Sequence, residues 1–205
     1  MKNKTKKTTP QTLKGFRNSL PVKVFKNTKV GIFIDEANIF YIQKELGWKI
    51  DWKKFASLFK TNLDLKILRY YLGMPSSGES RLKNLKIKNL LESFGYTVVT
   101  KPLKKIYLNN NKNSFKYKCN FDVEIALDIA SFLTELDLVI IVSGDSDFVA
   151  IKDFVLINKK KLIFVCFEKR VSWEIRKSKY LFLEKFKDLI QLNKNPGKSQ
   201  GEITK

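Results

Sequence analysis

Short runs of consecutive apolar residues recur along the chain, each followed by a longer segment with helical periodicity. The clearest runs lie in Val30–Ile34 (VGIFI), Asp137–Val142 (DLVIIV) and Leu162–Phe167 (LIFVCF). Apolar runs of this length without polar alternation are typical of strands buried on both faces, as in a parallel sheet covered by helices on either side. The sequence therefore predicts an α/β fold of three layers, with a central, mostly parallel sheet flanked by helices.

Other segments complete this alternation. We expect further strands at Leu65–Leu72 and Tyr96–Thr100, and a hairpin within Lys101–Lys118. Helices are expected at Ile39–Leu46, Asp51–Lys60, Glu79–Phe94, Phe121–Leu136 and Phe148–Asn158, with one or two more within Ser172–Ile190. Asp51 is predicted to cap the helix that it begins, and Gly95 to end the helix before it.

The two ends of the chain differ in composition from the middle. Residues 1–29 contain nine basic residues, no acidic residue and little apolar periodicity, which predicts a flexible basic arm over residues 1–28. The last residues are polar and include Pro196 and two glycines, so residues 191–205 are expected to be a disordered tail. A single domain over residues 29–190 lies between these two segments.

The chain carries a net charge of +20, from 40 Lys and Arg residues against 20 Asp and Glu residues. Lysine accounts for 35 of the 40 basic residues. Lysine offers a point charge suited to phosphates, whereas arginine has the bidentate fork that reads bases. The composition favours a polyanion bound without base specificity. The alternative, that the lysines reflect an AT-rich genome and solubility, stays open.

The composition also excludes several classes of protein. The chain has no histidine, which removes catalytic triads with a histidine base and histidine zinc sites. Two cysteines, Cys119 and Cys166, are too few for a thiolate zinc site or a disulfide framework. No apolar run approaches the ~20 residues that span a bilayer, and no apolar segment follows the basic N-terminus as in a secretory signal. We therefore expect a cytoplasmic protein that does not bind a membrane.

Acidic residues follow two of the predicted strands directly. The segment DEAN (35–38) follows the first strand, and SGDSDF (143–148) follows the strand DLVIIV. Because ligands bind at the carboxyl ends of the strands in open parallel sheets, Asp35, Asp145 and Asp147 are candidates for a site. The alternative is that Ser146 or Asp147 only caps the helix that begins at Phe148.

A further acidic position is predicted at the start of the helix after residue 121. On a helical wheel, Asp122 lies in line with Ala126, Ile129 and Leu133, a stripe that should face the sheet. Its position in the first turn then places its carboxylate beside the strand ends. Asp128 falls on the opposite face, which should be solvated, and is expected to have a supporting role only.

Several carboxylates in one crevice repel one another unless a cation neutralises them. A hard ion with oxygen ligands, Mg²⁺ or Mn²⁺, is therefore the expected cofactor, with Asp35, Asp122 and Asp145 as its ligands. On a strongly basic protein, acidic residues with such an ion are suited to reactions of phosphodiesters.

The segments DxxN at 35–38, FDV at 121–123 and SGDSDF at 143–148 resemble the NYN domain (LabA-like), a branch of the PIN-like nucleases. The resemblance covers roughly residues 29–190. It implies a PIN-like (Rossmann-like) fold, a divalent-metal site and ribonuclease activity on RNA. The residues that match the family signature are Asp35, Asn38, Asp122, Asp145 and Asp147.

This chain departs from the family pattern just before the helix that carries Asp122. The family commonly has Lys-Gly there, whereas this chain has Cys119 and Asn120. Asn120 can replace the glycine where the backbone needs a positive φ, and the neighbouring Lys118 can replace the lysine.

These arguments assign a role to each candidate residue. The predicted catalytic residues are Asp35, Asp122, Asp145 and Asp147. The predicted substrate-binding residues are Asn38, Ser143, Ser146, Lys104, Lys105, Lys116 and Lys118. In the hairpin the lysines alternate with aromatic residues, a pattern that suits phosphate attraction with base stacking, unless the rings pack against the domain. The competing function is a non-catalytic RNA-binding or adaptor protein of the same fold, and assembly into a homo-oligomer stays open.

Overall fold

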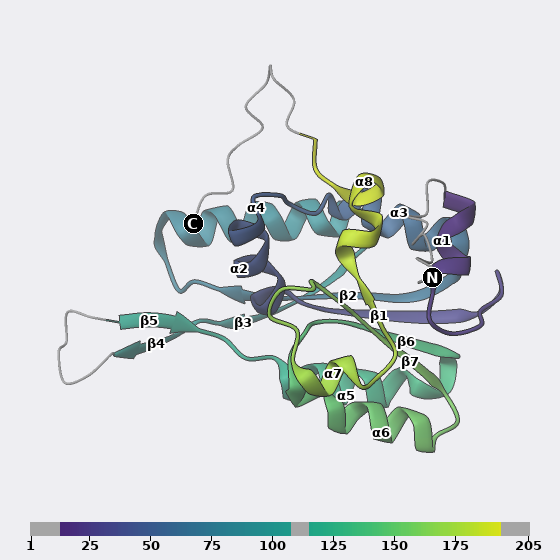
Figure 1. Ribbon diagram of the computed structural model, residues 1–205. Coiled ribbons are helices and arrows are strands. Elements are labelled where there is room, and N and C mark those ends of the chain that lie inside the picture. Colours follow the sequence, from purple (N-terminus) through teal and green to yellow (C-terminus); the bar gives the residue numbers. More distant parts are fainter. Residues whose placement is uncertain (1–12, 108–114, 194–205) are drawn as a thin grey trace, which may run out of the picture.

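Six parallel strands form the central sheet in the computed structural model, which describes residues 13–107 and 115–193 (Figure 1). The strands are β1 (Lys29–Asp35), β2 (Asp64–Met74), β3 (Thr97–Pro102), β6 (Leu138–Val142), β7 (Lys161–Cys166) and β8 (Tyr180–Phe182). They are arranged in the order β3-β2-β1-β6-β7-β8, and every neighbouring pair is parallel. The predicted α/β fold with a mostly parallel sheet is confirmed.

Helices cover both faces of this sheet (Figure 1). One face carries α1 (Leu13–Ser19), α2 (Glu36–Leu46), α3 (Trp52–Asn62), α4 (Gly78–Ser93) and α8 (Lys187–Ile190), and the other carries α5 (Asp122–Phe132), α6 (Val149–Ile157) and α7 (Trp173–Arg176). In β6, Ile140 and Val142 pack in the core of the first face, and Val139 and Ile141 in the core of the second. Burial on both faces explains why this strand contains no polar residue.

The direction in which strands are added reverses between β1 and β6. From β1 the chain adds β2 and then β3 on one side, and it then returns to add β6, β7 and β8 on the other side. In open α/β sheets this reversal is the usual place of ligand binding, because the helices that follow the two strands lie on opposite faces. Asp35 ends β1 at this point, and residues 143–147 follow β6 there.

Two predicted helix ends are confirmed in detail. The side chain of Asp51 accepts a hydrogen bond at 3.0 Å from the backbone N–H three residues later, and so caps α3. Gly95 has a φ of +90°, and its N–H and that of Tyr96 bind the carbonyls of Glu92 and Leu91. This pair of hydrogen bonds is the Schellman arrangement, which favours glycine at this position.

The prediction of a flexible arm over residues 1–28 is wrong for the residues from 13 onward. Phe16 of α1 is fully buried, and its ring lies 5.0 Å from that of Phe59 and 5.4 Å from that of Phe186, centroid to centroid. Leu20 is buried in the same core. Two apolar residues among many basic ones make too weak a pattern to reveal a helix of seven residues. Residues 1–12 lie outside the described residues.

The C-terminal region also differs from the prediction. The segment expected to hold one or two helices contains α7, α8 and, between them, the short strand β8, which pairs with β7 through Phe164–Tyr180 and Cys166–Phe182. Three residues are too few to show a periodicity. The domain also continues past residue 190, because the Leu192 N–H binds the carbonyl of Lys49. Residues 194–205 of the predicted tail lie outside the described residues.

The predicted hairpin is present as β4 (Lys104–Tyr107) and β5 (Phe115–Lys118), which pair antiparallel. This two-stranded ribbon is separate from the central sheet and projects away from it (Figure 1). The turn expected at 109–113 lies outside the described residues. Over the part of the chain that the structure describes, no helix has both the length and the apolar character needed to cross a membrane.

Candidate functional site

Asp35 and Ser143 meet where the two central strands end. Asp35 is the last residue of β1 and only 8% exposed, and Ser143, directly after β6, is fully buried. The Ser143 hydroxyl donates a hydrogen bond to Oδ2 of Asp35 at 3.2 Å. Its oxygen also accepts a hydrogen bond from the backbone N–H of Asp145 at 3.2 Å. Ser143 therefore fixes Asp35 relative to the loop that carries Asp145.

Asn38 holds the same loop from the other side. It lies in the first turn of α2, and its Oδ1 accepts a hydrogen bond from the Gly144 N–H at 3.0 Å. A side chain at residue 144 would be crowded, because its Cβ would lie 3.3 Å from Cα of Val171. Asn38 thus has a structural contact in addition to the substrate contact predicted for it.

Asp145 has a half-buried side chain that also caps the turn after it. Its Oδ1 accepts a hydrogen bond from the Asp147 N–H at 3.1 Å, at the start of the 3₁₀ turn Ser146–Phe148 that leads into α6. Asp147 is exposed and Ser146 half-buried, whereas Phe148 is buried in the core. The cap that was considered for Ser146 or Asp147 is therefore made by Asp145 instead. Its Oδ1 makes the capping hydrogen bond, and its Oδ2 takes no part in it.

Asp122 joins these residues as the first residue of α5, on the opposite face of the sheet from α2. Its backbone N–H donates to Oδ1 of Asn120 at 2.8 Å. The backbone does not need a positive φ at Asn120, because the described residues other than glycine with a positive φ are Lys159 and Arg170. Asn120 supports the helix start through its side chain instead.

The carboxylates act on one another electrostatically. The pKa of Asp35 is raised to about 6, chiefly by burial and also by the charges of Asp122 and Asp145, although the hydrogen bond from Ser143 lowers it. Burial also raises the pKa of Asp122, the contact with Asn120 lowers it, and the charges of Asp145 and Asp147 raise it. We call Asp35, Asp122, Asp145 and Asp147 the acidic group.

The acidic group has the right donors for a hard cation, because carboxylate oxygens bind Mg²⁺ and Mn²⁺ and a cation would relieve their mutual repulsion. The side chains do not converge on one point, however. Within residues 13–107 and 115–193, no three acidic or cysteine side chains lie close enough together to hold a metal ion as they stand. Binding of a metal ion by three of these carboxylates therefore requires their side chains to move closer together.

The expectation that Asp128 lies on a solvated face of its helix is wrong. Its carboxylate accepts hydrogen bonds from Nη1 of Arg69 at 2.7 Å and from the Tyr71 hydroxyl at 2.6 Å. Both partners belong to β2, and Tyr71 lies opposite Asp35 in the sheet register. Asp128 therefore ties α5, the helix that begins with Asp122, to the sheet. A helical wheel of α5 alone contains no signal for partners on β2.

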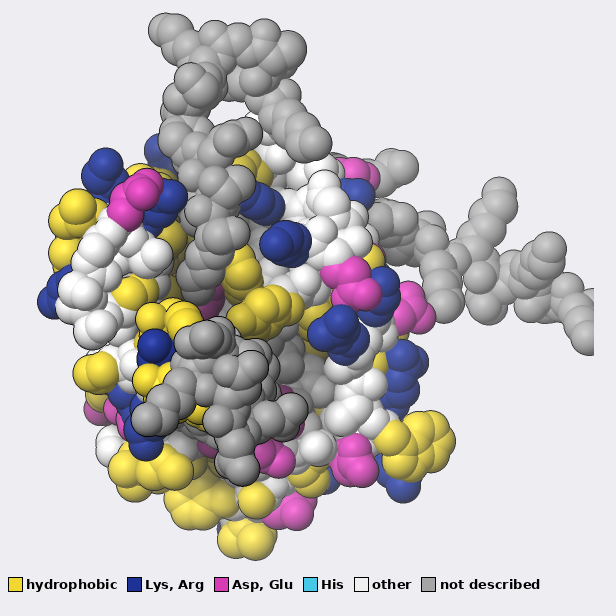
Figure 2. All heavy atoms as spheres, turned by 90° about the vertical axis from the view of Figure 1, so that its left-hand side faces the viewer, with side chains coloured by type: hydrophobic (Ala, Val, Ile, Leu, Met, Phe, Trp, Pro, Cys, Tyr) yellow, Lys and Arg dark blue, Asp and Glu magenta, His cyan; other side chains and the backbone are white. Residues whose placement is uncertain are grey.

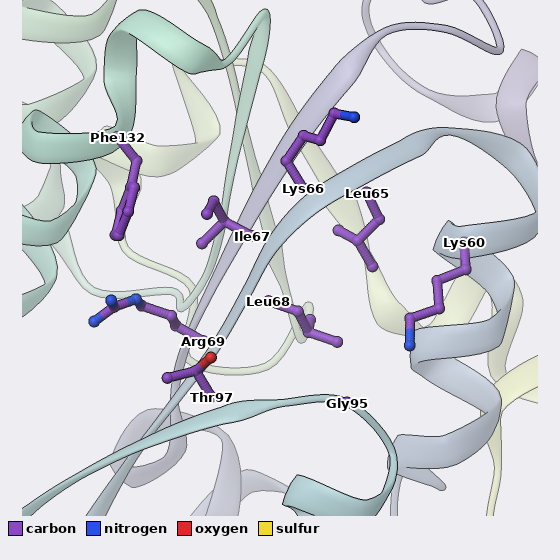
Figure 3. Close-up of a pocket in the computed structure, with 9 residues that line it drawn as sticks. All are labelled: Lys60, Leu65, Lys66, Ile67, Leu68, Arg69, Gly95, Thr97 and Phe132. Atoms are coloured by element: carbon purple, nitrogen blue, oxygen red, sulfur yellow. The ribbon is translucent and has the colours of Figure 1, made fainter.

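A pocket of about 270 Å³ lies beside Arg69 (Figure 3). The Arg69 guanidinium extends toward Phe132, and its Cζ lies 4.8 Å from the centre of that ring. The pocket is lined by Lys60, Leu65, Lys66, Ile67, Leu68, Arg69, Gly95, Thr97 and Phe132. It contains none of the predicted site residues. We place the candidate site at the acidic group, because these residues lie where the strand order reverses, the usual place of ligand binding in open α/β sheets.

The predicted substrate-binding lysines belong to the hairpin. Lys118, the last residue of β5, lies close enough to Asp122 for its charge to lower the pKa of that carboxyl, and Lys104 pairs with Lys118 across the ribbon. Lys105 is exposed one residue further along β4. Lys116 pairs with Ile106, and its side chain lies outside the described part of the structure.

Comparison with known proteins connects this arrangement to a family. The NYN domain model matches residues 29–184, a range that includes all six strands and the acidic group. The Low amplitude and bright protein LabA of Synechococcus elongatus is 26% identical over 176 residues, which cover 84% of this chain and 92% of that protein. A Vibrio parahaemolyticus protein of unknown function, known from its crystal structure, has the same fold with a TM-score of 0.62 and 19% identity, over 83% of this chain and 100% of that one. The chain therefore belongs to the NYN domain family, within the PIN-like nuclease superfamily.

Proposed function

We propose that this protein is a metal-dependent ribonuclease that hydrolyses phosphodiester bonds of RNA at the carboxyl ends of β1 and β6. One observation carries the proposal: four carboxylates from three separate segments form the acidic group at the reversal of strand order. Like charges that raise one another's pKa are unfavourable unless a cation neutralises them. The net charge of +20 supports RNA as the polyanion that is attracted to the protein, and we place this activity in the cytoplasm.

Each residue has a stated part in this proposal. Asp35, Asp122 and Asp145 hold Mg²⁺ or Mn²⁺ through carboxylate oxygens. When bound, such an ion activates a water molecule and stabilises the leaving oxygen of the phosphodiester. Ser143 favours the charged form of Asp35 by its hydrogen bond. Asp147 is exposed at the rim of the group and orients the attacking water, and Asn38 keeps the loop of Asp145 in place.

A non-catalytic RNA-binding or adaptor protein is the second candidate. It is favoured by the spread of the carboxylates, because no three acidic side chains within the described ranges converge on one point. In that function the acidic residues serve the fold, as Asp145 does when it caps the turn after β6. The two functions differ in one measurable property, which is cleavage that depends on a divalent ion.

The deciding experiment incubates the purified protein with end-labelled single-stranded and structured RNAs in Mn²⁺, Mg²⁺ or EDTA. We expect cleavage with a divalent ion and none in EDTA. Asp145→Asn keeps the shape of the side chain but weakens a hard-ion ligand, so cleavage should be lost while RNA binding is retained or improved. Asp147→Asn should reduce cleavage less than Asp145→Asn.

The matched control is Asp153→Asn, the same substitution at an exposed position of α6, which should cleave like the wild type. Mn²⁺ binding, followed by electron paramagnetic resonance, gives a readout independent of turnover. It should weaken in Asp145→Asn but not in Asp153→Asn. A wild type that binds RNA but cleaves it with no divalent ion would establish the adaptor function. An Asp145→Asn protein that fails to fold would show that the residue serves mainly as a cap.

A further inference from the structure

The β4–β5 hairpin has two different faces. Residues directly opposite each other in an antiparallel pair share a face, and residues two apart along a strand share it as well. The register pairs Lys105 with Tyr117 and Tyr107 with Phe115, so one face carries three aromatic rings and one lysine. Lys104 and Lys118, which also pair, stand on the opposite face.

The ring of Phe115 contacts those of Tyr107 and Tyr117, and all three rings remain exposed. The ring centroids of Tyr107 and Phe115 are 6.4 Å apart, and those of Phe115 and Tyr117 are 5.5 Å apart. These side chains are 41% to 54% exposed, and none of them belongs to either hydrophobic core. The alternative that the rings pack against the domain is therefore wrong. A row of exposed aromatic rings on a ribbon without a core of its own needs an explanation other than folding.

Lys105 gives the aromatic face a positive charge. Its Nζ lies 3.8 Å from the centroid of Phe115 and 5.0 Å from that of Tyr107. The rings meet edge to face. A cation beside them attracts a phosphate, while exposed ring faces offer flat surfaces to bases. Figure 2 looks at the side of the molecule from which the hairpin projects, and basic and hydrophobic side chains lie next to each other there.

The stem of the hairpin is fixed to the domain next to the acidic group. Nζ of Lys101, at the end of β3, donates to the Asn120 carbonyl at 2.8 Å and forms an ion pair with Glu124 of α5. The same Nζ lies 5.5 Å from the centre of the Phe121 ring. The Leu103 N–H binds the carbonyl of Met74 at 2.9 Å. These contacts fix the ribbon to the domain at the point where β5 ends and the chain leads into α5 and Asp122.

Charge changes sign sharply where the hairpin meets α5. Residues 101–118 contain six lysines and no acidic residue, whereas residues 119–151 contain seven acidic residues and no basic one. A polyanion is repelled by the second segment unless a cation is bound, and is attracted by the first. The hairpin, which leads directly into α5, is thus an element that can hold RNA beside the acidic group.

We infer that the β4–β5 hairpin binds single-stranded RNA, stacks unpaired bases on Tyr107, Phe115 and Tyr117, and leads the strand to the acidic group. Lys104 and Lys118 contact phosphates on the other face of the ribbon. Duplex RNA is a poor ligand, because its bases are stacked on each other and do not offer their faces to the rings. The inference rests on the proposed function only for what happens to the strand at the acidic group.

The test measures RNA binding in EDTA, where cleavage does not interfere. The probes are a fluorescent uridine oligonucleotide of about 20 nucleotides and an RNA duplex of the same length, followed by fluorescence anisotropy. Tyr107→Ala, Phe115→Ala and Tyr117→Ala should each weaken binding of the single strand about tenfold, and change the weaker duplex binding little. Unchanged urea unfolding midpoints would show that the domain remains folded in each variant.

Phe25→Ala is the matched control. Phe25 is 57% exposed and has Nζ of Lys23 5.5 Å from its ring centre, but it precedes β1 at the amino ends of the strands. This variant should bind RNA like the wild type.

The inference is overturned if the hairpin variants keep wild-type affinity for RNA, if Phe25→Ala loses as much RNA affinity as they do, or if the hairpin variants change only in self-association. Hairpin variants that cleave with wild-type kcat/KM would overturn it and leave the ribonuclease proposal intact. If the hairpin variants lose RNA binding and neither they nor the wild type cleave RNA, the result would support the inference about the hairpin and reject the ribonuclease proposal.

Discussion

The Ser143 hydroxyl donates a hydrogen bond to the Asp35 carboxylate across the two central strands, at 3.2 Å from Oγ to Oδ2. The two residues are 108 positions apart in the chain, and both are buried. The same oxygen accepts the N–H of Asp145, so one hydroxyl connects two members of the acidic group. The pKa of Asp35 therefore depends on the hydrogen bond from Ser143 as well as on the burial of Asp35 itself.

Replacing Ser143 with alanine should reduce both stability and the charge of Asp35. The change removes the hydrogen bond to Asp35 and leaves the Asp145 N–H without its partner, and an unsatisfied buried group costs about 1–3 kcal/mol. The pKa of Asp35 should rise further, because a contact that favours its charged form is lost. Urea unfolding checks the stability, and Ser131→Ala, an exposed serine on α5, should change it by much less. Equal losses in the two variants would contradict the importance of this contact.

Asp35 should make the metal-free protein less stable as the pH rises. Its pKa is about 6 in the folded state against 3.8 ordinarily, so the folded protein holds the proton more tightly than the unfolded chain does. The resulting penalty is absent below about pH 4, grows up to about pH 6, and reaches about 3 kcal/mol above it. Asp35→Asn removes the penalty.

Unfolding in EDTA checks this prediction. Asp35→Asn should be more stable than the wild type at pH 7 and equally stable at pH 4, whereas Asp153→Asn should match the wild type at both values. A gain of the same size at pH 4 and pH 7 would show that ionisation of Asp35 is not its cause.

Phe16 should contribute strongly to stability although it lies in a segment rich in basic residues. Phe16→Ala leaves a cavity between Phe59 and Phe186, and such a loss typically costs about 3–5 kcal/mol. Deletion through residue 25 removes α1 entirely and should destabilise the domain as well. The control Phe25→Ala concerns an exposed ring and should have little effect on the thermal midpoint. A deletion variant with unchanged cooperative unfolding would mean that α1 is dispensable.

Asp128 should anchor α5 through Arg69. Asp128→Asn removes the negative charge that faces the guanidinium, and hydrogen bonds to charged groups contribute about 1.5–3 kcal/mol each. Glu135→Gln, an exposed acidic residue just after α5, is the control and should leave stability nearly unchanged. In a double-mutant cycle with Arg69→Met, the combined loss should be smaller than the sum of the single losses. Strict additivity would argue against a direct interaction.

RNA binding should weaken steeply with salt. Lysine contacts to phosphates release counterions, and contacts to about three to six phosphates of a single strand predict a slope of about −2 to −4 in log K against log salt concentration. Anisotropy titrations in EDTA at several salt concentrations check this slope, and Lys104→Gln and Lys118→Gln should each make it shallower. Affinity that does not change with salt would contradict binding through phosphates.

Much of the fold could be predicted from the sequence, because its signals are local. The apolar run of β6 requires burial on both faces, Asp51 caps its helix through its own side chain, and Gly95 takes a φ of +90° that other residues rarely adopt. Each of these features depends on residues within a few positions of one another. The sequence also identified Asp35 and Asp145 as strand-end acids, because they follow apolar strands directly.

The tertiary structure decided what depends on contacts between distant segments. Phe16 became a core residue because α3 and the region before α8 enclose it, and Tyr180–Phe182 became a strand because the edge of β7 was available for pairing. Asp128 faces Arg69 because α5 packs over β2 at that point. No periodic pattern records such contacts, since each is made by one or two residues and depends on where another part of the chain lies. The sequence by itself determined which residue types stand at the strand ends, and only the folded sheet decided which of them touch.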